Sequence, residues 1–212
     1  MTPVAALGAA LRDLYQQSWR LFLLNAALSA FVVPVAIAGF WIPALWLLLV
    51  LAGPLAAGLM HCAVVVASTE ELRLRDAVAG VRIHWRRGLA LGALLAVVAV
   101  VGAHAVSFYA SRVLLLAVVA VYLLVVFCAF QLVLWPLAVL ERERPARRVL
   151  EDALRALVAR PVQALALTAI LAVVNVLGLA AAIIPFLTLT IAYSFLVAAH
   201  FVLPETPLEA ES

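Results

Sequence analysis

The chain has 212 residues, of which 68% are hydrophobic and 12% are charged, and its mean hydropathy is +1.22. This composition lies far outside the range of water-soluble globular domains and indicates an integral membrane protein. The net charge of +3 does not favour nucleic-acid binding, because a basic nucleic-acid interface needs a soluble domain to carry it. We expect anionic lipid headgroups to be the counter-charge.

The apolar runs are long enough to cross a bilayer once or twice each, since a transmembrane helix needs roughly 20 apolar residues. The first run is interrupted by Gly39 and Pro43, which predict a helical hairpin with spans at 21–39 and 44–67. A short turn at 110–112 separates the next two spans. These spans are predicted at 88–109 and 113–140.

The last apolar run, 162–203, is too long for a single crossing. A turn between Gly178 and Pro185 predicts two further spans, at 162–182 and 183–203. A protein with five spans is the natural alternative. In either case the sequence predicts an all-α, polytopic transmembrane bundle that forms one integral membrane domain over residues 1–212.

Two polar connectors, 68–87 and 141–161, separate the three apolar runs. Ser68 and Glu71 have the spacing of a capping box, which predicts that a new helix begins in the first connector. Both connectors contain amphipathic stretches with one apolar and one arginine-bearing face. Helices of this kind lie in the headgroup plane, so we expect interfacial helices on the cytoplasmic side.

All fourteen basic residues are arginine, and thirteen of them fall in three short segments, 12–20, 73–87 and 142–160, which we call the basic segments. The exception is Arg112, in the predicted turn at 110–112. Short loops rich in Lys and Arg remain in the cytoplasm. This distribution predicts a multi-pass membrane protein with both termini in the cytoplasm.

The basic segments also share a pattern, because Leu11-Arg12-Asp13, Leu74-Arg75-Asp76 and Leu150-Glu151-Asp152 each begin an amphipathic stretch that leads into a span. The pattern predicts three copies of an in-plane helix followed by a transmembrane hairpin. Chance similarity among short amphipathic connectors is the alternative.

Few polar side chains are expected at membrane depth, and none of them is acidic or basic apart from histidine. The absence of intramembrane carboxylates disfavours ion-coupled transport. Asn25, Gln131 and Asn175 are predicted to form hydrogen bonds between helices. Trp135 is predicted to anchor the protein at the inner interface, as tryptophan commonly does.

The sequence contains no motif of a hydrolase, a zinc protease or a phosphate-binding loop, so it predicts no enzyme activity and no catalytic residue. Cys62 and Cys128 lack the spacing of a metal or redox site and are interpreted as small apolar side chains. No metal-binding residue, no cofactor and no cofactor-binding residue is expected.

The stretch from Ala52 to Leu59, Ala-Gly-Pro-Leu-Ala-Ala-Gly-Leu, precedes a basic connector that contains Arg82-Ile-His-Trp-Arg-Arg-Gly88. In these features the chain resembles the YesL-like family of small bacterial membrane proteins, over nearly its full length. The resemblance implies a bacterial inner-membrane setting, which for some family members lies near carbohydrate-uptake systems. The chain differs from many relatives in lacking lysine and in its high content of alanine and valine.

These features predict a non-enzymatic accessory or scaffold subunit whose cytoplasmic face binds anionic lipids or a membrane-protein partner, such as a transport complex. The residues predicted to form this surface are Arg73, Arg75, Arg86, Arg87, Arg147 and Arg148. The alternative is a small permease with a path at mid-membrane. That path would be lined by Asn25, Gly53, Pro54 and Asn175.

Overall fold

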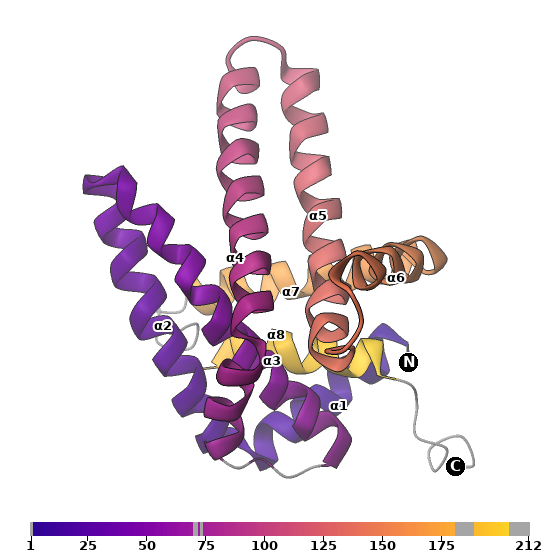
Figure 1. The fold of residues 1–212 in the computed structure, drawn as a ribbon. Helices are drawn as coiled ribbons and strands as arrows, with labels where there is room; N and C mark the ends of the chain where they lie inside the picture. The colour runs from indigo at the N-terminus through magenta and orange to yellow at the C-terminus, as the bar shows by residue number, and fades with distance from the viewer. Residues whose placement is uncertain (1, 70–71, 73, 181–188, 204–212) are drawn as a thin grey trace.

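The computed structural model describes residues 2–69, 72, 74–180 and 189–203, and every regular element in these ranges is helical (Figure 1). The all-α prediction is therefore confirmed. The elements, in chain order, are α1 (Pro3–Gln16), α2 (Ser18–Trp41), the 3₁₀ helix η1 (Pro43–Leu51), α3 (Ala52–Thr69), α4 (Leu74–Ala110), α5 (Leu114–Leu140), α6 (Ala146–Ala159), α7 (Pro161–Ala180) and α8 (Ile191–Val202).

Five helical stretches within the described ranges are long and apolar enough to cross a membrane: Trp19–Gly39, Leu48–Thr69, Arg75–Ala110, Leu114–Leu140 and Pro161–Gly178. A polytopic membrane protein is thus supported by length and composition. The count agrees with the five-span alternative rather than with six spans.

The predicted sixth span, 183–203, is represented by α8, whose 12 residues fall short of the roughly 20 that a crossing needs. Part of that span, residues 183–188, lies outside the described residues, as does most of the predicted turn between Gly178 and Pro185. Helix α7 continues beyond Gly178 to Ala180.

The first connector differs from the prediction, because its amphipathic part and the third span form the single 37-residue helix α4. The prediction that Ser68 caps a new helix is wrong. Ser68 lies in the last turn of α3, where its hydroxyl donates to the carbonyl of Val65 at 3.1 Å, and α4 begins only at Leu74. Glu71 lies outside the described residues.

Helices α4 and α5 run side by side as a hairpin that rises above the rest of the molecule, while α2, η1 and α3 form a second arm (Figure 1). The largest buried cluster lies where α1, α3 and α8 meet below these arms. Its fully buried side chains include Leu21, Met60 and Leu196. Trp135 belongs to this core and stacks on Phe195 with ring centroids 6.3 Å apart, so its side chain packs inside the protein and does not anchor it in the headgroup layer.

Helices α3 and α4 cross at a point where glycines allow their backbones to touch. A Cβ atom on Gly88 would lie 2.7 Å from the Cα atom of Pro54, and one on Gly92 would lie 2.8 Å from the carbonyl oxygen of Val50. A Cβ atom on Gly53 would meet the carbonyl oxygen of Gly88. Small residues at such crossings let membrane helices approach closely and pack tightly.

The substitution Gly88→Ala is expected to lower the free energy of unfolding by about 1–3 kcal/mol, because the new methyl group meets backbone atoms that have no room to shift. Gly8→Ala in α1 is the matched control. A Cβ atom there has no neighbour within 4 Å, so alanine should be neutral or stabilising by up to ~1 kcal/mol. Unfolding in mixed micelles, followed by circular dichroism, measures the free energy of unfolding of both variants. Equal changes in the two variants would contradict the close helix crossing.

Candidate functional site

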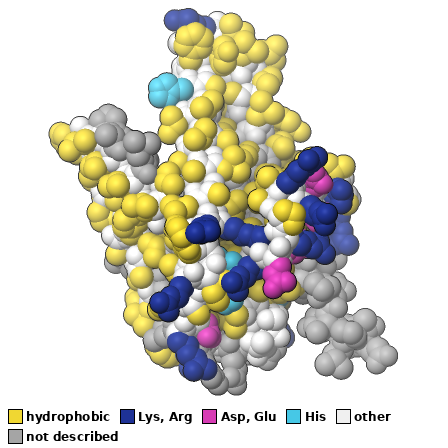
Figure 2. All heavy atoms as spheres, in the orientation of Figure 1, with side chains coloured by type: hydrophobic (Ala, Val, Ile, Leu, Met, Phe, Trp, Pro, Cys, Tyr) yellow, Lys and Arg dark blue, Asp and Glu magenta, His cyan; other side chains and the backbone are white. Residues whose placement is uncertain are grey.

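The arginines lie mainly at one end of the molecule. Figure 2 shows basic side chains over the lower half of this face and over α6, while the hairpin above them is almost entirely apolar. Arg112 stands apart in the turn that joins α4 to α5, with its guanidinium 4.0 Å above the ring of Phe108. The structure therefore separates the basic segments from Arg112 by the length of the hairpin.

The six arginines predicted to form a surface do not share one environment. Arg73 lies outside the described residues. Four are exposed to solvent or headgroups: Arg75, Arg86, Arg147 and Arg148. Arg87 is partly buried.

Acidic neighbours balance part of the charge on α6. Arg147 Nε pairs with Glu151 at 2.8 Å, and Arg144 pairs with Glu141 at 2.9 Å and with Asp152 at 3.3 Å. Exposed pairs of this kind contribute little to stability. Within the described part of the chain, Arg148 has no carboxylate at ion-pair distance, so its full charge remains available.

Arg87 holds the carboxyl end of α5 and the turn that follows it. Its Nη1 donates to the carbonyl oxygens of Ala138 and Glu141, both at 2.9 Å. Its Nη2 donates to the carbonyl oxygen of Arg142 at 2.6 Å and to that of Arg144. The last carbonyl oxygens of a helix lack donors within the helix, and here the Arg87 guanidinium provides the donors.

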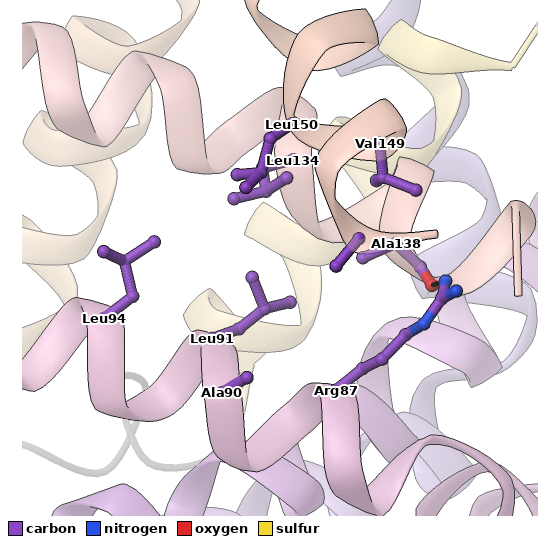
Figure 3. A pocket seen from close by; sticks show the side chains of 9 residues that line it. Arg87, Ala90, Leu91, Leu94, Leu134, Ala138, Val149 and Leu150 are labelled. Carbon is purple, nitrogen blue, oxygen red and sulfur yellow. Dashed lines mark hydrogen bonds between the residues drawn. The ribbon is translucent and has the colours of Figure 1, made fainter. Parts of the chain in front are cut away.

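Beside Arg87, a cavity of about 160 Å³ lies between α4, α5 and α6 (Figure 3). Its walls are alanine, leucine and valine side chains, among them Leu91 and Leu94 of α4, Leu134 and Ala138 of α5 and Val149 of α6. Arg87 is the one charged residue that lines it. The cavity therefore combines an apolar interior with a cationic rim.

The amino end of α6 adds positive potential to this rim. Its N-cap, Pro145, offers no side-chain acceptor, and its first turn contains no acidic residue. The first amides of a helix carry partial positive charge. Arg147 and Arg148 lie in the same turn.

The residues predicted to line a mid-membrane path lie in different surroundings within the described part of the chain. Gly53 lines an apolar cavity of about 430 Å³ between α2, η1, α3 and α4, but Asn25, Pro54 and Asn175 are not among its lining residues. Asn25 is fully buried in α2. Pro54 faces Gly88 at the α3–α4 crossing.

Asn175 forms the kind of interhelical bond that its position predicts. Its Nδ2 donates to the carbonyl oxygen of Leu171 in its own helix and to Ser194 Oγ of α8 at 2.8 Å. The interhelical hydrogen bond predicted for Gln131 is not formed. Its side-chain amide is buried, and neither its nitrogen nor its oxygen has a hydrogen-bond partner in the described part of the chain.

A buried acid–histidine pair connects the two ends of the described chain. Asp13 of α1 is 2% exposed, and its Oδ2 lies 2.8 Å from Nε2 of His200 in α8. Tyr193 Oη adds a bond to the carbonyl oxygen of Leu7 at 3.2 Å. These contacts hold α1 against α8, so α1 is more than an amphipathic helix resting on a surface.

A second buried histidine, His84 of α4, is 3% exposed and lies beside His61 of α3 with ring centroids 5.4 Å apart. The described residues contain no group of three or more His, Cys, Asp or Glu side chains placed to hold a metal ion. Cys62 is buried, and Cys128 is exposed on α5.

Comparison with known proteins finds no match: no protein-family model, no curated protein and no solved structure is similar to this chain.

Proposed function

We propose that the protein is a non-enzymatic accessory or scaffold subunit of a bacterial inner membrane, whose arginine-rich cytoplasmic face binds anionic headgroups. The observation that carries this proposal is the collection of basic side chains at one end of an otherwise apolar molecule (Figure 2). The resemblance to the YesL-like family supports the inner-membrane setting and a link to carbohydrate uptake. A membrane-protein partner would assemble on the same face.

The orientation follows from the energetic cost of moving guanidinium groups through hydrocarbon. Arg112 alone would lie outside the cell, and the basic segments would lie in the cytoplasm. The carboxyl-terminal turns of α1 and α8 meet at Asp13 and His200, which supports a location of these two helix ends on the same, cytoplasmic side. In this orientation α6 is an interfacial helix, and cytoplasmic positions for both termini require an even number of spans, as in the six-span prediction.

A permease with a path near Gly53 and Pro54 receives less support from the geometry. The cavity that Gly53 lines is bounded by apolar side chains such as Leu28, Val32 and Trp135. Sites for polar solutes usually present several oriented polar groups. Uptake of a sugar or an amino acid by proteoliposomes that contain the purified protein alone would favour the permease and contradict the accessory role.

Selectivity for anionic lipid tests the proposal. Electron spin resonance of reconstituted vesicles is expected to show more motionally restricted spin-labelled phosphatidylglycerol than phosphatidylcholine. The preference should weaken as salt is raised, since each surface arginine contributes about 1 kcal/mol at most and is screened. The triple variant Arg75→Gln, Arg82→Gln, Arg86→Gln removes three exposed charges of α4 and should lose most of the preference.

Arg112→Gln is the matched control, because it removes an exposed arginine from the opposite end of the hairpin. It should leave the selectivity unchanged when the phosphatidylglycerol is confined to the leaflet that contacts the basic segments. An equal preference for both lipids in the unmodified protein, at low salt, would refute the proposal.

A further inference from the structure

We propose that the apolar cavity under α6 holds part of an acyl chain of one anionic phospholipid, whose phosphate lies at the cationic rim formed by Arg87 and the first turn of α6. This inference rests on the proposed function and names its ligand class. It also assigns that ligand to one place on the arginine-rich face, instead of a diffuse layer of headgroups.

The interior of the cavity suits a hydrocarbon chain. Its walls come from Ala90, Leu91 and Leu94 of α4, from Leu134 of α5 and from Val149 of α6 (Figure 3). A volume of about 160 Å³ is too small for a helix, which is about 10–12 Å across with its side chains. A water-filled cavity would need polar groups to bond the water, and these walls provide almost none.

The rim suits a phosphate. The guanidinium of Arg87 is fixed by four carbonyl oxygens, which are neutral, and no carboxylate among the described residues pairs with it. It therefore keeps its whole positive charge while its position is set. The uncapped amino end of α6 and the unpaired Arg148 add to the same local potential.

The other side of α6 provides an internal comparison. A wider hollow of about 420 Å³ lies between α5 and α6 and is lined by apolar side chains that include Leu123, Phe127 and Leu154. The charged residue in its lining is Glu151, which pairs with Arg147 at 2.8 Å and with Arg155 at 3.8 Å, so no cation lines this hollow among the described residues. Two apolar hollows thus flank one helix, and only the one beside Arg87 has the charge that complements an anionic lipid.

Native mass spectrometry in mild detergent tests the assignment after delipidation and addition of phosphatidylglycerol or phosphatidylcholine. The unmodified protein should bind one phosphatidylglycerol in preference to phosphatidylcholine. Ala90→Trp fills the cavity from an exposed position of α4 and should weaken this binding about tenfold, the equivalent of roughly two buried methylene groups. Leu123→Trp, an equally exposed change in the other hollow, should leave it within about twofold.

Four results would overturn the inference. Three of them are equal binding of the two lipids, unchanged phosphatidylglycerol binding in Ala90→Trp, and equal losses in Ala90→Trp and Leu123→Trp. The fourth is displacement of the lipid by inorganic phosphate alone, which would indicate an anion site without an acyl chain. If Ala90→Trp does not fold, Ala146→Trp fills the same cavity from the exposed first residue of α6.

The two proposals can fail separately. Suppose that the cavity holds no lipid but the face as a whole selects anionic lipid. Ala90→Trp will then retain the spin-label preference of the unmodified protein, and mass spectrometry will show no preferred binding of one phosphatidylglycerol to the delipidated protein. If the face has no role in lipid selection, the triple arginine variant will retain that preference, whatever happens in the cavity.

Discussion

Replacement of Arg87 with alanine is expected to lower the free energy of unfolding by about 3 kcal/mol, because four carbonyl oxygens at the end of α5 lose their common donor. Hydrogen bonds from a charged donor each have a net value of about 1.5–3 kcal/mol, and the loss is set mainly by the partly buried carbonyls of Ala138 and Glu141, because water can reach the exposed ones of Arg142 and Arg144. The turn from Glu141 to Arg144 should loosen, and α6 should lose its fixed position above the apolar cavity. Denaturant unfolding in micelles measures the free energy.

Two further substitutions isolate the role of the guanidinium. Arg87→Lys keeps the charge but cannot present donors to four acceptors in a planar fork, so it should recover less than half of the loss. Arg86→Ala removes the neighbouring arginine, which is exposed and lies over the ring of Trp85, and should cost less than about 1 kcal/mol. Full recovery of the free energy of unfolding by lysine would show that charge alone matters. The hydrogen bonds from Arg87 to the four carbonyl oxygens would then not account for the stability.

Loss of the buried pair between α1 and α8 should be at least as damaging. Asp13→Ala or His200→Ala removes one partner from a contact that is 2.8 Å long and almost fully enclosed. Removal of one member of a buried pair typically costs about 3–5 kcal/mol, because the remaining polar group stays buried without its partner. For His200→Ala the cation that remains at ion-pair distance among the described residues is Arg12, whose Nε lies 3.8 Å from the carboxylate.

A double-mutant cycle separates the pair from its surroundings. The double variant Asp13→Ala, His200→Ala should cost about 1–3 kcal/mol less than the sum of the single variants, since the two residues interact directly. Tyr193→Phe removes the other polar contact between α1 and α8, at 3.2 Å, and should cost only about 1 kcal/mol. Strict additivity of the two single effects would show that the pair is not coupled.

The sequence predicts the all-α class and a polytopic membrane architecture, because apolar run length decides both, but its preferred count of six spans exceeds the five long apolar helices found among the described residues. The predictions from the sequence fail where a side chain or a backbone segment can adopt more than one local structure. Ser68 can cap a following helix or bond back to its own, and the structure shows the second. The amphipathic connector and the third span merge into α4 because no proline or cap interrupts residues 74–110.

The tertiary contacts are harder to predict from one sequence. The sequence places both Arg86 and Arg87 in a basic segment. Nothing in it indicates that Arg87, unlike Arg86, binds backbone carbonyls of another helix. Asp13 lies in an amphipathic stretch, and its burial depends on α8, which is far away in the sequence. One signal was available: Gly88 and Gly92 form a Gly-x-x-x-Gly motif, which marks close helix crossings in membranes.

The sidedness of the basic segments is the claim on which the lipid and partner surface depends. In a variant whose Cys62 and Cys128 are replaced by alanine, Ser111→Cys and Glu143→Cys each introduce one exposed thiol, at opposite ends of the α4–α5 hairpin. A membrane-impermeant maleimide added to intact cells should label the cysteine at 111 and leave the one at 143 unlabelled until the cells are opened. Labelling of the cysteine at 143 from outside intact cells would contradict the account.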